Sequence, residues 1–191
     1  MPTVFRFFLA IALGLGVGTL SGAQGPPASA LVYRNDCPYE GPCADSVWVA
    51  QEQLPAYARL NDTSRRAFVI TAGQRLRFHR AFIVVDQPGR LIVTTSQDRY
   101  RAGDTVHVLG YEGEGHYRVW HRDSVMVLDP TSLEADADAR RDEEPWLPRF
   151  TWWVEVSVGE GRRGWLALRN VAAGGIGFDE HLDMRPDRPR R

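Results

Sequence analysis

Three glycines near the end of the chain have the spacing of a nucleotide-binding loop. Gly159, Gly161 and Gly164 form the pattern G-x-G-x-x-G within SVGEGRRGWLAL. In dinucleotide-binding folds this pattern joins a strand to a helix whose N-terminal amides face the pyrophosphate. The residues after Gly164 are too few and too rich in glycine for such a helix, and both flanks alternate like strands. The motif therefore predicts a hairpin turn, as do the glycines of GYEGEG.

Side chains that could catalyse hydrolysis do not form a recognisable set. A cysteine peptidase needs a thiolate beside a histidine base, and the serine hydrolase motif G-x-S-x-G is not found in the sequence. Glu112 and Glu114 could serve as an acid and base pair. They flank Gly113 in a predicted turn, however, where charged side chains are ordinarily solvated. We therefore predict no catalytic residue.

The 5 histidines lack the spacing of a metal site. His79 and His107 each alternate with their neighbours along a strand, which predicts that both face solvent. His116 and His121 lie five residues apart on one predicted strand, and therefore on opposite faces. The aspartates of EADADARRD lack the glycine and the terminal glutamate of a calcium loop. We predict neither a metal nor a cofactor.

Aromatic side chains are the best candidates for ligand-binding residues in the sequence, which has 6 tryptophans and 6 tyrosines. Adjacent Trp152 and Trp153 must point to opposite faces of a strand, so one can enter the core while the other stays partly exposed. Most of the rings are expected to fill small cores. The rings that do not fill these cores are predicted to form an exposed groove, lined by Tyr57, Tyr111 and Trp153, that would bind an extended peptide or glycan strand.

The first residues have the pattern of a secretory signal peptide. Arg6 precedes an apolar run from Phe7 to Leu20, and small residues follow as far as Ala23. This run of 14 residues is shorter than the roughly 18 that a membrane span needs. We therefore predict cleavage of residues 1–23, no membrane span afterwards, and export to the periplasm or out of the cell.

Export changes the interpretation of the two cysteines. Cys37 and Cys43 enclose PYEGP, whose prolines and glycine can fold the chain back on itself. An oxidising compartment favours a disulfide, and closing so short a loop stabilises a fold by about 2–3 kcal/mol in the chain-entropy model. We predict a disulfide between Cys37 and Cys43, with metal ligation by two free thiols as the weaker alternative.

The charge balance gives no reason to expect nucleic acid as a partner. The 191 residues include 23 basic and 24 acidic side chains, and loss of Arg6 with the signal peptide leaves 22 basic and 24 acidic, a net charge near −2. Every basic residue is an arginine. Each cation of the chain is therefore a planar, permanently charged hydrogen-bond donor.

The elements that must position these side chains are strands. Apolar residues recur with period two in short segments bounded by Gly, Pro, Asn and Asp, and no longer segment has helical spacing. The class is therefore all-β, with small barrels or a sandwich expected. The predicted strands are Ser46 to Gln51, Leu54 to Leu60, Ala67 to Ile70, Arg75 to Phe82, Arg90 to Thr95, Thr105 to Tyr111, Tyr117 to Arg122, Val125 to Leu128, Thr151 to Val158 and Gly164 to Arg169.

An internal similarity predicts two partly duplicated β units. TAGQRLRF, residues 71–78, matches RAGDTVHV, residues 101–108, since each is an Ala-Gly turn followed by alternation. Two later segments, GEGHYRVWHRDSVMVL and WWVEVSVGEGRRGWLAL, both read as tight hairpins with aromatic arms.

These segments resemble bacterial SH3-like (SH3b-type) domains, which are small β-barrels common in exported proteins. The paired aromatics of Trp152 and Trp153, the glycine hairpin, and Gly164 with Trp165 are similar to the close of such a domain. LPAYAR, AFVI and AGQRL are similar to its opening half. The segment between the halves, with AGDTVHVLGYEGEGHYRVWH, resembles a second SH3-like unit inserted into the first.

The resemblance implies a modular organisation of the chain. The expected parts are a signal peptide (1–23), a disulfide-stapled segment (24–45), a first SH3-like unit in two halves (46–84 and 149–172), an inserted second unit (85–131), an acidic loop (132–148) and a C-terminal tail without regular structure (173–191).

We expect a non-catalytic binding module of the cell envelope that recognises a peptide, peptidoglycan or a protein partner. SH3-like domains bind cell-wall peptides, accompany hydrolases or only space their neighbours apart, so fold alone does not select the ligand. Two alternatives stay open: an envelope hydrolase or metal-dependent enzyme on a β scaffold, and a structural spacer with no small ligand. The sequence indicates no oligomeric state.

Overall fold

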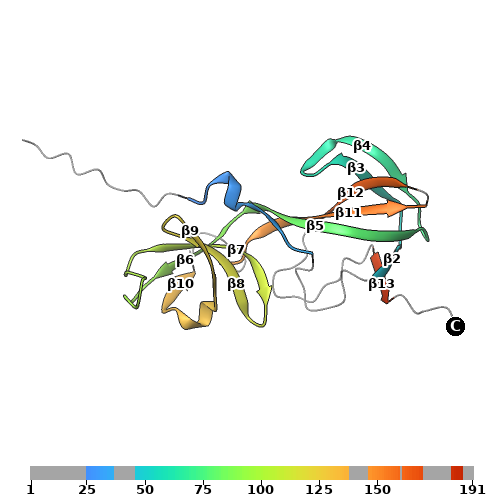
Figure 1. Ribbon diagram of the computed structural model, residues 1–191. Coiled ribbons are helices and arrows are strands. Elements are labelled where there is room, and N and C mark those ends of the chain that lie inside the picture. Colours follow the sequence, from blue (N-terminus) through green and yellow to red (C-terminus); the bar gives the residue numbers. More distant parts are fainter. Residues whose placement is uncertain (1–24, 37–45, 138–145, 160, 170–181, 187–191) are drawn as a thin grey trace, which may run out of the picture.

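The computed structural model describes residues 25–36, 46–137, 146–159, 161–169 and 182–186 (Figure 1). The predicted signal peptide and both cysteines, Cys37 and Cys43, lie outside these ranges. No helix in the described ranges has the length and apolar character to cross a membrane. The described chain consists of antiparallel strands and two short 3-10 turns, η1 (Ala28–Ala30) and η2 (Pro130–Ser132), which confirms the all-β class.

The larger sheet has the order β13-β2-β5-β11-β12-β3-β4, with β1 pairing to β5 as well. Its longest strand, β5, pairs with β11 over most of its length and forms the centre of the sheet. The strands are β1 (Val32–Arg34), β2 (Ser46–Ala50), β3 (Leu54–Arg59), β4 (Asp62–Ile70), β5 (Arg75–Gln87), β11 (Arg149–Val158), β12 (Arg162–Arg169) and β13 (Leu182–Pro186).

The smaller sheet has the order β10-β6-β7-β8-β9, and all of its strands lie between β5 and β11 in the sequence. Its strands are β6 (Gly89–Val93), β7 (Thr105–Gly113), β8 (His116–His121), β9 (Ser124–Leu128) and β10 (Ala135–Ala137). In Figure 1 this sheet forms the lobe at the left, and the long ribbons of β5 and β11 lead from it to the larger sheet.

The two sheets have partly similar strand orders. In the path β10-β6-β7-β8-β9 the last strand pairs with the first strand, and the others follow in chain order. In the larger sheet the last strand pairs with β2, whereas β1 pairs with β5, and the hairpin of β3 and β4, which precedes β5 in the chain, lies beside β12. Neither path closes into a barrel through strand pairing among the described residues.

The two Ala-Gly turns that suggested duplication make the same hydrogen bonds. The turns are Thr71–Gln74 and Arg101–Asp104. In each turn the backbone amide of the fourth residue donates to the backbone carbonyl of the first residue, at 3.1 Å in the former and 2.9 Å in the latter. The backbone amide of the first residue donates to the side chain of the fourth residue, Gln74 at 3.1 Å and Asp104 at 2.9 Å. The glycine, with φ of 78° and 88°, donates to Ala50 in one case and Val93 in the other, both at 2.8 Å. Each turn is therefore fixed against a strand of its own sheet, β2 in one case and β6 in the other.

All ten predicted strands are present, but three short ones, β1, β10 and β13, were missed. β10 lies in the segment predicted as an acidic loop, and β13 lies in the tail predicted to lack regular structure. Both predictions are wrong at these positions. β10 pairs with β6 and β13 pairs with β2 through backbone hydrogen bonds, which place little demand on side-chain type at a sheet edge.

The glycine motif is a hairpin turn, as predicted. β11 and β12 pair directly up to Val158 and Arg162, and Gly159 and Gly161 have φ of 54° and 93°. Gly164 lies in β12, where an added Cβ would be 3.0 Å from both Ala56 and Phe68. Its role is the close approach of β12 to the β3–β4 hairpin, and not phosphate binding.

The joint between the two sheets is built around Tyr33. Tyr33 lies in β1, beside β5 of the larger sheet, yet the Arg118 guanidinium of β8 sits 4.5 Å from the centroid of its ring. Its hydroxyl lies against Gly110 of β7, buried, with no hydrogen-bond partner in the described part of the chain. Burial is the main cause of a raised Tyr33 pKa, with Glu112 adding to it.

This joint predicts a specific steric dependence. We expect Gly110→Ala to destabilise the protein by about 1–3 kcal/mol, because the new Cβ would overlap the Tyr33 hydroxyl. In a Tyr33→Phe background the nearest ring atom would be 3.3 Å away, so Gly110→Ala should cost less than half as much. Urea unfolding of the wild type, both single variants and the double variant measures the coupling. Equal costs of Gly110→Ala in the two backgrounds would contradict this account.

Candidate functional site

The three aromatic residues predicted to line a groove do not come together. Tyr57 and Trp153 meet edge to face, with ring centroids 5.8 Å apart. Tyr111 lies in the smaller sheet, where it packs at 5.2 Å against Tyr117. Trp153 is only 2% exposed. The predicted groove therefore needs correction: Tyr57 belongs to the larger sheet's surface, Trp153 forms the base beneath it, and Tyr111 belongs elsewhere.

Adjacent Trp152 and Trp153 do point to opposite faces, but both are buried. Trp152 is 3% exposed in the main core, and Trp153 packs in a separate cluster with Val84 and Trp165. An alternating strand was expected to expose one of the two rings. The second ring is covered because partly buried apolar residues surround it, namely Tyr57, Leu60, Phe82 and Ala167.

We call the side of β5, β11 and β12 that carries Trp153 the outer face. Directly paired residues on neighbouring strands lie on the same face. The pairing therefore sets out three rows across β5, β11 and β12. The rows are Arg77–Ser157–Arg163, Arg80–Glu155–Trp165 and Phe82–Trp153–Ala167. The opposite face contains the main core, so this sheet has apolar residues on both sides.

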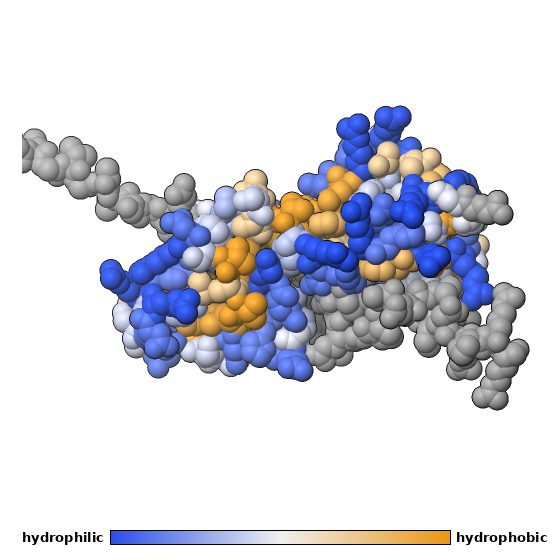
Figure 2. Space-filling model, in the orientation of Figure 1, coloured by the Kyte–Doolittle hydropathy of each residue, from blue (hydrophilic) through white to orange (hydrophobic). Residues whose placement is uncertain are grey.

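The aromatic part of the outer face is closely packed and partly accessible. Phe82 and Trp165 have ring centroids 6.0 Å apart, and the Arg80 guanidinium lies 5.5 Å from the centroid of Trp165. Arg80 donates to Glu155 at 2.8 Å. Tyr57 and Phe82 are half-buried, so each presents part of a ring to solvent above the buried tryptophans. Figure 2 shows apolar residues over the middle of the molecule, with hydrophilic residues around them.

A β-bulge places His79 at the polar end of this face. The pairing shifts so that Arg80 opposes Glu155 while Phe78 opposes Val156, which leaves His79 as the extra residue. The His79 Nε2 lies 2.9 Å from the Ser157 Oγ. Burial lowers the His79 pKa, and the positive charge of Arg163 lowers it further. The imidazole is therefore held toward its neutral form.

The contact between His79 and Ser157 satisfies the first requirement of nucleophilic catalysis, a hydroxyl within reach of a base. A third group must also orient the imidazole. No carboxylate in the described ranges is hydrogen-bonded to His79, and Glu155 is bound to Arg80 instead. Among the described residues the geometry pairs a histidine with a serine, and no carboxylate completes a triad there.

The positions of the histidines can be compared with the prediction that they form no metal site. His116 is exposed and His121 is 3% exposed, so the two face opposite ways as predicted. His79 and His107 are half-buried, and the prediction that both face solvent is wrong because the surrounding sheet covers part of each ring. Within the described chain no three His, Cys, Asp or Glu side chains are grouped closely enough to hold a metal ion.

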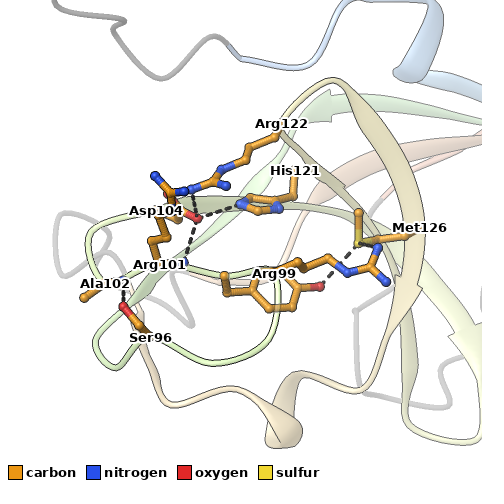
Figure 3. A network of polar contacts seen from close by, with 9 residues as sticks. Ser96, Arg99, Arg101, Ala102, Asp104, His121, Arg122 and Met126 are labelled. Atoms are coloured by element: carbon orange, nitrogen blue, oxygen red, sulfur yellow. Dashed lines mark hydrogen bonds and ion pairs between the residues drawn. The ribbon is translucent and has the colours of Figure 1, made fainter.

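His121 belongs to a polar network at the edge of the smaller sheet (Figure 3). Its Nε2 lies 2.9 Å from Asp104, which also accepts from Arg122 at 2.9 Å and from the Arg101 amide at 2.9 Å. Tyr100 packs on the His121 ring at 4.8 Å. Sequence reasoning missed this network, because the partners lie in a turn and a hairpin that meet only after folding.

The network is an anchor for a strained hairpin. Arg122 and Asp123 connect β8 to β9 with φ of 43° and 66°, a left-handed pair that favours Asn and Gly. The ion pair between Arg122 and Asp104 ties this hairpin to the duplicated turn. Burial acts to raise the Asp104 pKa, but hydrogen bonds from the Arg101 amide, Arg122 and His121 hold it below its ordinary value.

This anchor predicts a pH-dependent contribution to stability. We expect Asp104→Asn to lower the free energy of unfolding by about 1–3 kcal/mol at about pH 7, because it weakens contacts to a buried histidine and an arginine. The folded-state pKa of Asp104 is lowered, so its contribution is present above the ordinary pKa and is lost as pH falls through the folded-state pKa.

Urea unfolding of the wild type and the variant between about pH 7 and about pH 3 measures this contribution. Asp123→Asn, a change in the same hairpin, is the matched control and should have little effect. A difference between the wild type and Asp104→Asn that stays constant down to the lowest pH would show that the carboxylate charge is not responsible.

Comparison of the chain with protein-family models, with curated proteins and with solved structures finds no match. A function is therefore inferred from the geometry of the outer face.

Proposed function

We propose that this protein is an exported, non-catalytic binding module of the bacterial cell envelope. Its ligand is an extended peptide strand, presented by peptidoglycan or by a protein partner, and the outer face of the larger sheet binds it. The main support for this proposal is the aromatic cluster around Trp153, which lies on the outer face, away from the main core. Antiparallel sheets ordinarily have one apolar face and one solvated face.

Two features support an SH3-like architecture within this proposal. In both sheets the last strand pairs with an early strand, β6 in one and β2 in the other, and both sheets contain the same hydrogen-bonded Ala-Gly turn. The strands of the smaller sheet lie between β5 and β11, the layout expected of one unit inserted into another. We propose that the two units are SH3-like, with the first supplying the binding surface.

The chemistry of the face suits a peptide strand better than a small metabolite. Tyr57 and Phe82 offer ring surface that can pack against alternate side chains or sugar rings. Arg80 is fixed between Glu155 and the ring of Trp165, so the floor of the face is ordered before a ligand arrives. A preformed floor lowers the entropy cost of binding.

Retention on purified peptidoglycan tests the proposal. We expect the wild-type protein to sediment with peptidoglycan, and Tyr57→Ala to weaken retention about 10-fold or more, because a partly exposed ring at a binding centre typically contributes more than 1 kcal/mol. Tyr57→Phe keeps the ring and should retain binding. Tyr111→Ala, which removes a half-buried ring from the other sheet, is the control for location.

Thermal unfolding of each variant separates lost binding from lost folding. If the wild type is not retained, peptidoglycan does not present the ligand. If Tyr57→Ala and Tyr111→Ala behave alike while both remain folded, the outer face is not the binding surface.

A further inference from the structure

The polar end of the outer face has an arrangement suited to a negatively charged group. Arg77 and Arg163 both pair with Ser157, one from β5 and the other from β12, so they stand on either side of it on the same face. Their Cα atoms are two strand spacings apart, about 10 Å. Two long guanidinium side chains at that separation can converge on one small anion above the central strand.

The arginines at this end have different partners. Arg80 is neutralised by Glu155 at 2.8 Å. Arg77 and Arg163 are exposed, and neither makes an ion pair with any residue that the structure describes. Among the described residues at this end of the face the charge is therefore positive, and Arg77 and Arg163, which flank Ser157, have no ion-pair partner there.

The floor between these two arginines is fixed by the bulge. His79 and Ser157 are joined at 2.9 Å, so neither side chain is free to swing across the space between Arg77 and Arg163. Burial lowers the His79 pKa, and the charges of Arg163, Arg77 and Arg80 lower it further against the opposing charge of Glu155. A bulge that re-aims a side chain is a frequent feature beside binding sites.

We infer that Arg77 and Arg163, over the floor of His79 and Ser157, form a subsite for a carboxylate of the bound strand. The inference rests on the proposed function, since it places the carboxylate beside the rings of Phe82 and Trp165 on the same face. Guanidinium groups bind carboxylates through paired, charge-assisted hydrogen bonds. The ligand class is therefore an extended peptide that carries a free carboxylate next to an apolar or sugar segment.

Binding of soluble peptidoglycan fragments, untreated and with every carboxylate amidated, tests the subsite. We expect amidated fragments to bind about 10-fold or more weakly than untreated ones. The double variant Arg77→Gln/Arg163→Gln should lose a similar factor for untreated fragments and nothing for amidated ones. Arg65→Gln, which removes an exposed arginine from β4, is the matched control for net charge and should keep wild-type affinity.

Two synthetic pentapeptides identify the source of the carboxylate. One has a free C-terminus as its single carboxylate, and the other has an amidated C-terminus and one glutamate side chain. The double variant should weaken the binding of at least one of them, which then assigns the source. If it weakens neither, the subsite is wrong.

The outcomes separate the two proposals. If Tyr57→Ala abolishes binding while amidation and the double variant leave it unchanged, the face binds its ligand but the carboxylate subsite is wrong. If the wild type binds neither untreated fragments nor either peptide, the proposed function fails and the subsite fails with it.

Discussion

The pairing of β5 with β11 is the interaction on which the rest of the molecule depends. These two strands pair from Arg77 to Gln87, and together they supply the centre of the main core on one side and the aromatic cluster on the other. A sheet that buries rings on both faces cannot slip by one residue without exchanging the two sets. The register is therefore fixed twice, once by Trp152 in the core and once by Trp153 on the outer face.

The same strand pair explains how a second sheet can be accommodated. The strands β6 to β10 all lie between β5 and β11 in the sequence. The ends of β5 and β11 that flank these strands are held together by their own backbone hydrogen bonds. The smaller sheet has its own apolar cluster, and Tyr33, Leu109 and Trp120 join the sheets in the main core. The inserted strands thus add a separate core without interrupting the ladder that shapes the outer face.

The sequence predicted the strands well because alternation is a local property. It predicted the hairpin at Gly159 and Gly161 and the equivalent turns, each of which is decided within a few residues. β10 and β13 could not be predicted, since their only structural requirement is a partner strand far away in the sequence. The aromatic groove failed for a related reason: alternation placed Trp153 on the correct face, but the burial of its ring depends on Tyr57, Leu60 and Phe82, which arrive from other strands.

The candidate site was partly hidden from sequence reasoning by the bulge at His79. Counting by twos along β5 places Arg77, His79 and Ala81 on one face, whereas the bulge moves Arg80 and Phe82 to the outer face and Ala81 into the core. One extra residue thereby brings a cation onto Trp165 and an imidazole onto Ser157. Burial and the neighbouring cations lower the His79 pKa, whereas the guanidinium groups beside it stay protonated at any physiological pH. Under the function proposed above, these permanent positive charges would hold an anion over a floor whose side chains the bulge has already placed.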